Sequence, residues 1–206
     1  MACFPMLVEL KDMPCLVVGG GQVALHKVKV LLDFGARVTV VAPDILPELF
    51  GMEGVNCRTK MFEEGDLKGQ RLVVAAAGDS ECDRILSQAC RREKIPLNVV
   101  DSPKDCSFFF PAYLKEGEVV CAFSSSGQSP VVTQYLKEQM RPVMTAQIGE
   151  VSRCLGELRK TVQQRPQTRR AAKQIYQEIL RLSIELDRVP TEEEIGRILE
   201  RCAENL

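Results

Sequence analysis

The chain has 206 residues and a formal net charge of −1, a balance that argues against nucleic acid or a membrane surface as its main partner. No apolar stretch approaches the roughly 20 residues that cross a bilayer. Residues 1–12 contain no basic segment followed by an apolar run, so we expect a soluble, cytoplasmic protein. The 9 cysteines are scattered without a C-x-x-C motif and there is 1 histidine, so we predict neither a disulfide framework nor a metal site.

Strands and helices are predicted to alternate along the first hundred residues. Residues 4–10 alternate weakly between apolar and polar side chains and predict a short lead-in strand. Gly35 is expected to end the first long helix, and Asp79 or Ser80 to cap the next one. Five apolar runs predict parallel strands at residues 15–18, 37–41, 54–61, 72–77 and 97–100. This alternation predicts an α/β fold with a Rossmann-type, doubly wound parallel sheet.

A glycine-rich turn joins the first of these strands to its helix. Gly19, Gly21 and Ala24 occupy the three positions of the G-x-G-x-x-G/A motif. Gly19 permits the tight turn, Gly21 lets the backbone approach a pyrophosphate, and Ala24 lets the helix pack closely on the strand. The free N–H groups at the start of the helix would face the phosphates. The strand before and the helix after favour a dinucleotide site over a glycine turn that binds nothing.

The end of the second strand bears on which dinucleotide is bound. NAD-binding folds usually place an acidic residue there to bind the ribose hydroxyls, but this strand end is apolar and Asp44 comes two or three residues later. Asp44 is therefore either a ribose ligand or a turn residue after Pro43. Because no lysine or arginine stands nearby to bind a 2′-phosphate, we favour NAD over NADP.

Asp101 ends the fifth predicted strand, beside the expected cofactor cleft. A carboxylate there is suited to act as a general base for the proton that accompanies hydride transfer. The alternative is a turn-forming aspartate ahead of Ser102 and Pro103. Spacing alone leaves both interpretations open.

The pattern changes after Pro103. An apolar run at 118–123 predicts another strand, and Ser129 and Pro130 are expected to begin a helix that reaches about Met140. The serine-rich turn between them, residues 124–130, lacks the G-x-S-x-G motif of a hydrolase. We expect it to hold a substrate or an anion.

Residues from 145 onward are predicted to be helical. Two apolar faces are expected, one of Val151, Leu155, Leu158 and Val162, the other of Ile175, Ile179, Leu182 and Leu186. Thr191 and Glu194 have the S/T-x-x-E spacing of a capping box, which predicts the start of a final helix. Six basic residues between Arg159 and Lys173 form either a solvated helix face or a surface that binds a polyanion.

Several of these motifs, taken in order, resemble the precorrin-2 dehydrogenase family, the dehydrogenase and ferrochelatase module of siroheme synthases. The segments that carry the resemblance are 18–24, Lys27, 35–43, 98–103, Phe108, 111–112 and 124–130. The chain departs from the family at His26, where most members have arginine. The resemblance implies an NAD-binding Rossmann domain at 1–112, a small α+β dimerisation segment at 113–144 and a C-terminal helical domain at 145–206.

The resemblance also implies a reaction, the oxidation of precorrin-2 to sirohydrochlorin by NAD, followed in some members by ferrous iron insertion. Asp101 matches the catalytic aspartate, Ser125 with its neighbour Ser124 the substrate-binding turn, and the family forms homodimers. The implied cofactor-binding residues are Gly19, Gly21, Gln22, Val23, Ala24, Pro43 and Asp44. Alternatives from another class are a non-catalytic NAD-binding sensor and a scaffold that holds a tetrapyrrole.

Overall fold

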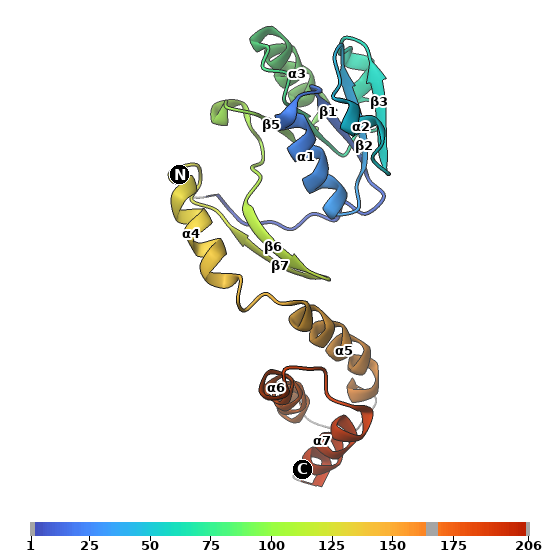
Figure 1. The fold of residues 1–206 in the computed structure, drawn as a ribbon, viewed down its shortest axis with the longest axis vertical. Helices are drawn as coiled ribbons and strands as arrows, with labels where there is room; N and C mark the ends of the chain where they lie inside the picture. The colour runs from blue at the N-terminus through green and yellow to red at the C-terminus, as the bar shows by residue number, and fades with distance from the viewer. Residues whose placement is uncertain (1–2, 164–168, 205–206) are drawn as a thin grey trace. The chain divides into compact units, whose positions relative to one another are not determined.

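The structure, a computed structural model, describes residues 3–163 and 169–204. The chain divides into two compact units, Cys3–Phe110 and a second unit that begins at Pro111 (Figure 1). Among the described residues, no helix is both long enough and apolar enough to cross a membrane.

The first unit is built on a five-stranded parallel sheet. Its strands are β1 (Pro14–Val18), β2 (Arg37–Ala42), β3 (Val55–Thr59), β4 (Leu72–Ala75) and β5 (Leu97–Val99), in the order β3-β2-β1-β4-β5. In β1, Val17 pairs with Val40 on one side and with Val74 on the other. The strand order reverses at β1, and in open sheets of this kind a ligand binds beside such a switch point.

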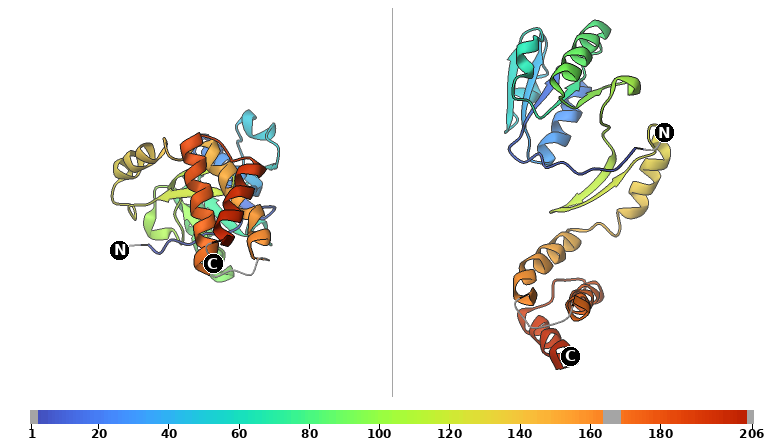
Figure 2. Two further views of the ribbon diagram at one scale, coloured as in Figure 1. Left: turned by 90° about the horizontal axis from the view of Figure 1, so that it is seen from below. Right: turned by 180° about the vertical axis from the view of Figure 1, so that it is seen from behind.

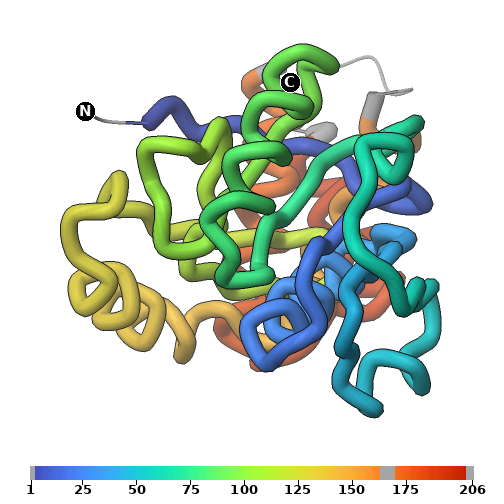
Figure 3. The backbone as a smooth tube through the Cα atoms, turned by 90° about the horizontal axis from the view of Figure 1, so that it is seen from above, coloured from blue at the N-terminus to red at the C-terminus, as the bar shows by residue number. Residues whose placement is uncertain are grey.

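Helices pack on both faces of this sheet. The helices are α1 (Gln22–Asp33), the short α2 (Pro47–Phe50) and α3 (Ser80–Glu93), with 3-10 turns at Glu64–Leu67 and Pro103–Asp105. Figure 3 traces the backbone of α1 in blue and of α3 in green. Because side chains alternate along a strand, Val17 packs with Val28 and Leu31 of α1, whereas Leu16 packs with Leu86 of α3. The two buried clusters fix both helices against the sheet.

The second unit begins with a hairpin of β6 (Ala112–Glu116) and β7 (Val119–Phe123), followed by α4 (Pro130–Met140). Three helices follow, α5 (Ala146–Gln163), α6 (Arg169–Leu186) and α7 (Glu192–Glu204), and Figure 2 shows α6 and α7 side by side. Val162, Ile175, Ile179 and Ile198 belong to their shared core. Leu155, Leu158 and Leu182 pack against this core as the sequence predicted, whereas Leu186, predicted on the same face as Ile179, is exposed.

The predicted fold class is confirmed in its parallel sheet, its small α+β segment and its helical C-terminal region. The predicted lead-in strand at 4–10 is wrong, because these residues form no strand in the described structure. Phe4 and Leu7 are 88% and 87% exposed, so the alternation buries neither side chain against a sheet. Strand β6 was not predicted; its signal is Gly117, whose φ of +58° suits the two-residue turn to β7.

The predicted helix caps are present. The Asp79 carboxylate accepts hydrogen bonds from the N–H groups of Glu81 (2.9 Å) and Cys82 (3.3 Å), which selects Asp79 over Ser80 as the cap of α3. The Ser129 hydroxyl accepts a hydrogen bond from Val132 N–H at 3.3 Å and caps α4. Both caps satisfy N–H groups that have no partner within their own helix.

The capping box of α7 is reinforced by an arginine. Glu194 accepts hydrogen bonds from Thr191 N–H at 2.7 Å and from both terminal nitrogens of Arg188 at 2.8 Å. The Thr191 hydroxyl accepts a hydrogen bond from Glu194 N–H at 3.3 Å. The Arg188 guanidinium and then the Thr191 N–H lower the pKa of Glu194 from 4.5 to about 2.

This depressed pKa predicts a pH dependence of folding stability. The stabilisation from ionised Glu194 should be fully present above the unfolded pKa of 4.5 and be lost as the pH falls toward about 2. The Glu194→Gln variant should therefore be less stable than the wild type at pH 7, and the difference should shrink between pH 5 and pH 2. Urea unfolding followed by far-UV circular dichroism measures it. Glu200→Gln, an exposed change on the same helix, is the control, and a pH-independent Glu194→Gln difference would contradict the assignment.

Candidate dinucleotide-binding site

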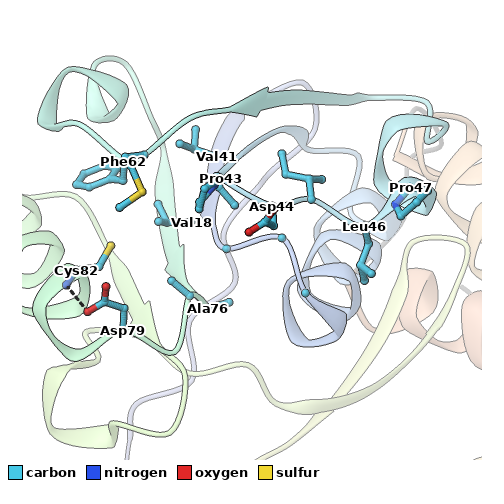
Figure 4. Close-up of a pocket in the computed structure, with 17 residues that line it drawn as sticks. Val18, Val41, Pro43, Asp44, Leu46, Pro47, Phe62, Ala76, Asp79 and Cys82 are labelled. Carbon is cyan, nitrogen blue, oxygen red and sulfur yellow. Dashed lines mark hydrogen bonds between the residues drawn. The ribbon is translucent and has the colours of Figure 1, made fainter.

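A cavity of about 570 Å³ lies at the carboxyl ends of β1, β2 and β4, within the first unit (Figure 4). Its lining comprises residues 18–21, 41–47, Met61, Phe62, Ala76, Ala77, Asp79 and Cys82. The position matches the switch point of the sheet, where β2 and β4 flank β1. The glycine turn forms one wall and the loop after β2 forms another.

Gly19 makes the turn out of β1. Its φ is +125°, a conformation that L side chains rarely adopt, and a Cβ there would lie 2.3 Å from the carbonyl oxygen of Ala76. The Gly19 N–H donates to the carbonyl of Val41 at 3.0 Å. Only glycine fits a turn that the segment after β4 approaches so closely.

Gly20 has a role that the motif does not indicate. A Cβ at Gly20 would lie 2.1 Å from the carbonyl oxygen of Asp44 and 2.7 Å from Cα of Ile45. The Gly20 carbonyl also accepts a hydrogen bond from Leu46 N–H at 2.9 Å. Gly20 thus lets the loop after β2 lie directly on the turn. The only signal of this contact in the sequence was a glycine at position 20, between the two glycines that the motif requires.

Gly21 differs from its two neighbours because its space is open. Apart from Gly21 itself and its two chain neighbours, no atom of the described residues lies within 4 Å of a Cβ built at Gly21, and its φ of −86° suits any residue. The first turn of α1, within the described part of the chain, has neither a side-chain cap nor an acidic residue. Its N–H groups are therefore available to an anion, and the helix dipole favours one. The turn fits the pyrophosphate of a dinucleotide.

The remaining predicted cofactor residues surround this turn. Gln22 and Val23 are exposed in the first turn of α1, whereas Ala24 is fully buried against the sheet. Pro43 and Asp44 line the cavity, and Figure 4 shows Asp44 beside the turn. Among the described lining residues there is no lysine or arginine to bind a 2′-phosphate.

Asp101 lies outside the lining of this cavity, in the loop that follows β5. Its φ of +61° places it in the left-handed region, and its side chain is exposed. The loop is tied to the sheet by hydrogen bonds from Val100 N–H to the Ala75 carbonyl (3.0 Å) and from the Asn98 amide to the Phe108 carbonyl (3.0 Å). The backbone therefore holds Asp101 at the β5 edge of the same end of the sheet.

Ser124 and Ser125 belong to the second unit, in the turn before α4. The Ser125 hydroxyl donates to the Ser129 carbonyl at 3.1 Å and accepts from the Ser129 N–H at 2.9 Å. The Ser124 hydroxyl accepts a hydrogen bond from Ser126 N–H at 3.1 Å. These contacts fix the turn at the positive end of α4.

Comparison with known proteins identifies the family of this fold. Residues 6–112 match the model of the family described as "Putative NAD(P)-binding". The chain belongs to this NAD(P)-binding family. The match covers the whole parallel sheet and confirms the prediction of a nicotinamide dinucleotide cofactor.

This member of the NAD(P)-binding family has curated relatives among siroheme synthases. It is 38% identical over 183 residues to the siroheme synthase of Methylococcus capsulatus, covering 87% of this chain and 39% of that protein. It is also 38% identical over 168 residues to the siroheme synthase of Methylobacillus flagellatus, covering 80% of this chain and 36% of that protein. The chain thus spans less than half the length of these relatives.

A solved structure has the same fold. The chain matches "SirC, precorrin-2 dehydrogenase" with a TM-score of 0.71 and 24% sequence identity, covering 98% of this chain and 100% of that chain. The likeness extends through the helical C-terminal region. It confirms the predicted architecture from the parallel sheet to the last helix.

Proposed function

We propose that this chain oxidises precorrin-2 to sirohydrochlorin with NAD as the electron acceptor. The observation that carries the proposal is the open glycine turn at the switch point, in a chain that is 38% identical to siroheme synthases. The reaction removes a hydride and a proton from the tetrapyrrole, so it needs a hydride acceptor and a base. When bound, NAD supplies the acceptor.

The residues of the glycine turn would hold the cofactor. Gly19, Gly21 and Ala24 shape the turn, and the N–H groups of Gln22 and Val23 would donate to the pyrophosphate. Pro43 and Asp44 would border the adenosine ribose, with the Asp44 carboxylate accepting from its hydroxyls. The lack of a lysine or arginine in the described cavity lining supports NAD over NADP.

Asp101 would take the proton that the substrate loses. Its carboxylate is exposed at the end of β5, on a loop whose backbone is tied to β4. A positioned carboxylate of this kind contributes catalysis by accepting a proton in the transition state. Ser124 and Ser125, at the N-terminus of α4, would contact carboxylates of the tetrapyrrole.

The chain would act as a homodimer. Each copy would have three functional parts: a cofactor domain at 1–112, a dimerisation segment at 113–144 and a helical domain at 145–206. Apolar side chains on α4 support the middle assignment, since Val131 is 78% exposed and Tyr135, one turn further along, is 61% exposed. An apolar face of this kind is suited to be covered by a second copy.

An anaerobic rate assay tests the proposal. Purified protein mixed with precorrin-2 and NAD should form NADH, followed by its absorbance, and should form little NADPH when NADP replaces NAD. Addition of ferrous iron then shows whether siroheme forms faster than in a protein-free control. Failure to form NADH despite NAD binding would reject the dehydrogenase and favour an NAD-binding sensor or a tetrapyrrole-holding scaffold.

A further inference from the structure

Lys27 lies on the face of α1 that packs against the first core cluster, and its ammonium group contacts an aromatic ring. Its side chain is half-buried and its Nζ lies 4.3 Å from the centroid of the Phe110 ring. In the described part of the chain no carboxylate lies within ion-pair distance of Nζ. Phe110 in turn packs against Phe108, with ring centroids 5.4 Å apart, and both rings contact the α1-side core. The closest contact described for the Lys27 ammonium is therefore a cation–π contact with an aromatic ring and not an ion pair.

The surroundings of this ammonium are unfavourable to its charge. Burial lowers the pKa of Lys27 from its ordinary value of 10.5, and negative charge on Cys106 and Asp101 would oppose that effect. Burial raises the pKa of the Cys106 thiol, so this group is neutral near pH 7. Asp101 is the carboxylate whose charge favours the ammonium form of Lys27. Asp105, on the same loop, is engaged with the Ser102 hydroxyl at 2.6 Å and faces Arg91 at 4.0 Å.

We infer that Lys27 binds a carboxylate of the tetrapyrrole substrate next to Asp101. A half-buried cation that lacks an ion pair is costly to maintain, and an incoming carboxylate would compensate it with a charge-assisted hydrogen bond. The inference rests on the proposed function, because precorrin-2 carries carboxylate side chains around the ring that is oxidised. One carboxylate bound to Lys27 would hold the ring edge near the base that takes its proton.

Two variants of Lys27 separate its charge from its packing. Lys27→Met keeps an unbranched apolar side chain over the Phe110 ring and removes the ammonium, whereas Lys27→Arg keeps a cation. Lys29→Met is the matched control, because Lys29 is an exposed lysine on the same helix. Initial rates measured against precorrin-2 at saturating NAD should show an increase in KM of about tenfold to a hundredfold for Lys27→Met. The kcat should change less, Lys27→Arg should recover part of the loss, and the Kd for NAD should be unchanged.

Equilibrium binding provides a second readout that does not depend on turnover. Sirohydrochlorin, a tetrapyrrole polycarboxylate, should bind Lys27→Met more weakly than the wild type by a similar factor, and Lys29→Met as tightly as the wild type. An unchanged KM and an unchanged sirohydrochlorin Kd in Lys27→Met would overturn the inference. So would a parallel loss of NAD affinity and thermal stability, which would indicate that Lys27 only packs on Phe110. If the wild type forms no NADH, the proposed function fails, and the binding comparison still decides the role of Lys27.

Discussion

Replacement of Asp101 by asparagine should lower the turnover of precorrin-2 by about 10²–10⁴-fold, the typical contribution of a general base, with NAD bound as tightly as in the wild type. Asparagine keeps the size of the side chain and tolerates the left-handed backbone, so the φ of +61° at this position can be retained. What is lost is the ability to accept a proton. Asp101 is also absent from the cavity lining, so the cofactor should not sense the change.

Asp105→Asn is the matched control for this experiment. Asp105 lies on the same loop and is also acidic, but its carboxylate accepts a hydrogen bond from the Ser102 hydroxyl at 2.6 Å. Its replacement should slow turnover by no more than a few-fold. Single-turnover rates and NAD titration calorimetry on both variants make the comparison. An Asp101→Asn enzyme that keeps wild-type turnover, or an Asp105→Asn enzyme that is equally slow, would remove Asp101 from the role of base.

Alanine at Gly21 should weaken NAD binding by about tenfold or more without changing the stability of the fold, whereas alanine at Gly20 should destabilise the fold by about 1–3 kcal/mol. Beyond the adjoining residues of the chain, no described protein atom lies within 4 Å of a Cβ at Gly21, so the added methyl group would meet the bound cofactor. A Cβ at Gly20 lies 2.1 Å from the Asp44 carbonyl oxygen, so either the turn or the loop after β2 must move. The two neighbouring glycines therefore serve different purposes.

Thermal unfolding and calorimetric NAD titration of both variants distinguish these purposes. Gly21→Ala should unfold at the wild-type temperature and show the larger Kd, while Gly20→Ala should unfold several degrees lower even without NAD. Equal NAD affinity in Gly21→Ala and the wild type would mean that the pyrophosphate does not approach this turn. Wild-type stability of Gly20→Ala would mean that the loop is not held against it.

The parts of this molecule that could be predicted from its sequence are those set by local pattern. The buried runs of β1 and β2, the turn at Gly19 and the cap at Asp79 each depend on a few adjacent residues, and all are present in the structure. The same rules predicted a strand at 4–10, which fails because a strand also needs a neighbour to pair with, and pairing is a tertiary property. Gly117 marks the turn between β6 and β7, but the pattern of residues in β6 did not by itself predict a strand.

The contacts that the sequence did not reveal join segments far apart in the chain. Gly20 is constrained by Asp44 and Ile45, and Lys27 by the ring of Phe110. A motif records the residue type at each position, yet it does not record which distant backbone lies 2.1 Å from a missing Cβ. Asp101 is the intermediate case, since its place after β5 was predicted while its left-handed conformation depends on the loop that Asn98 ties back.

The most direct test of the proposed function is the stoichiometry of the anaerobic reaction with the wild-type protein. NADH formed and precorrin-2 consumed would be measured in the same cuvette, with the product identified by its absorption spectrum. We expect one NADH for each precorrin-2 consumed, together with the spectrum of sirohydrochlorin. Consumption of precorrin-2 without NADH, or bound NAD that is never reduced, would contradict the assignment of this chain as an NAD-dependent dehydrogenase.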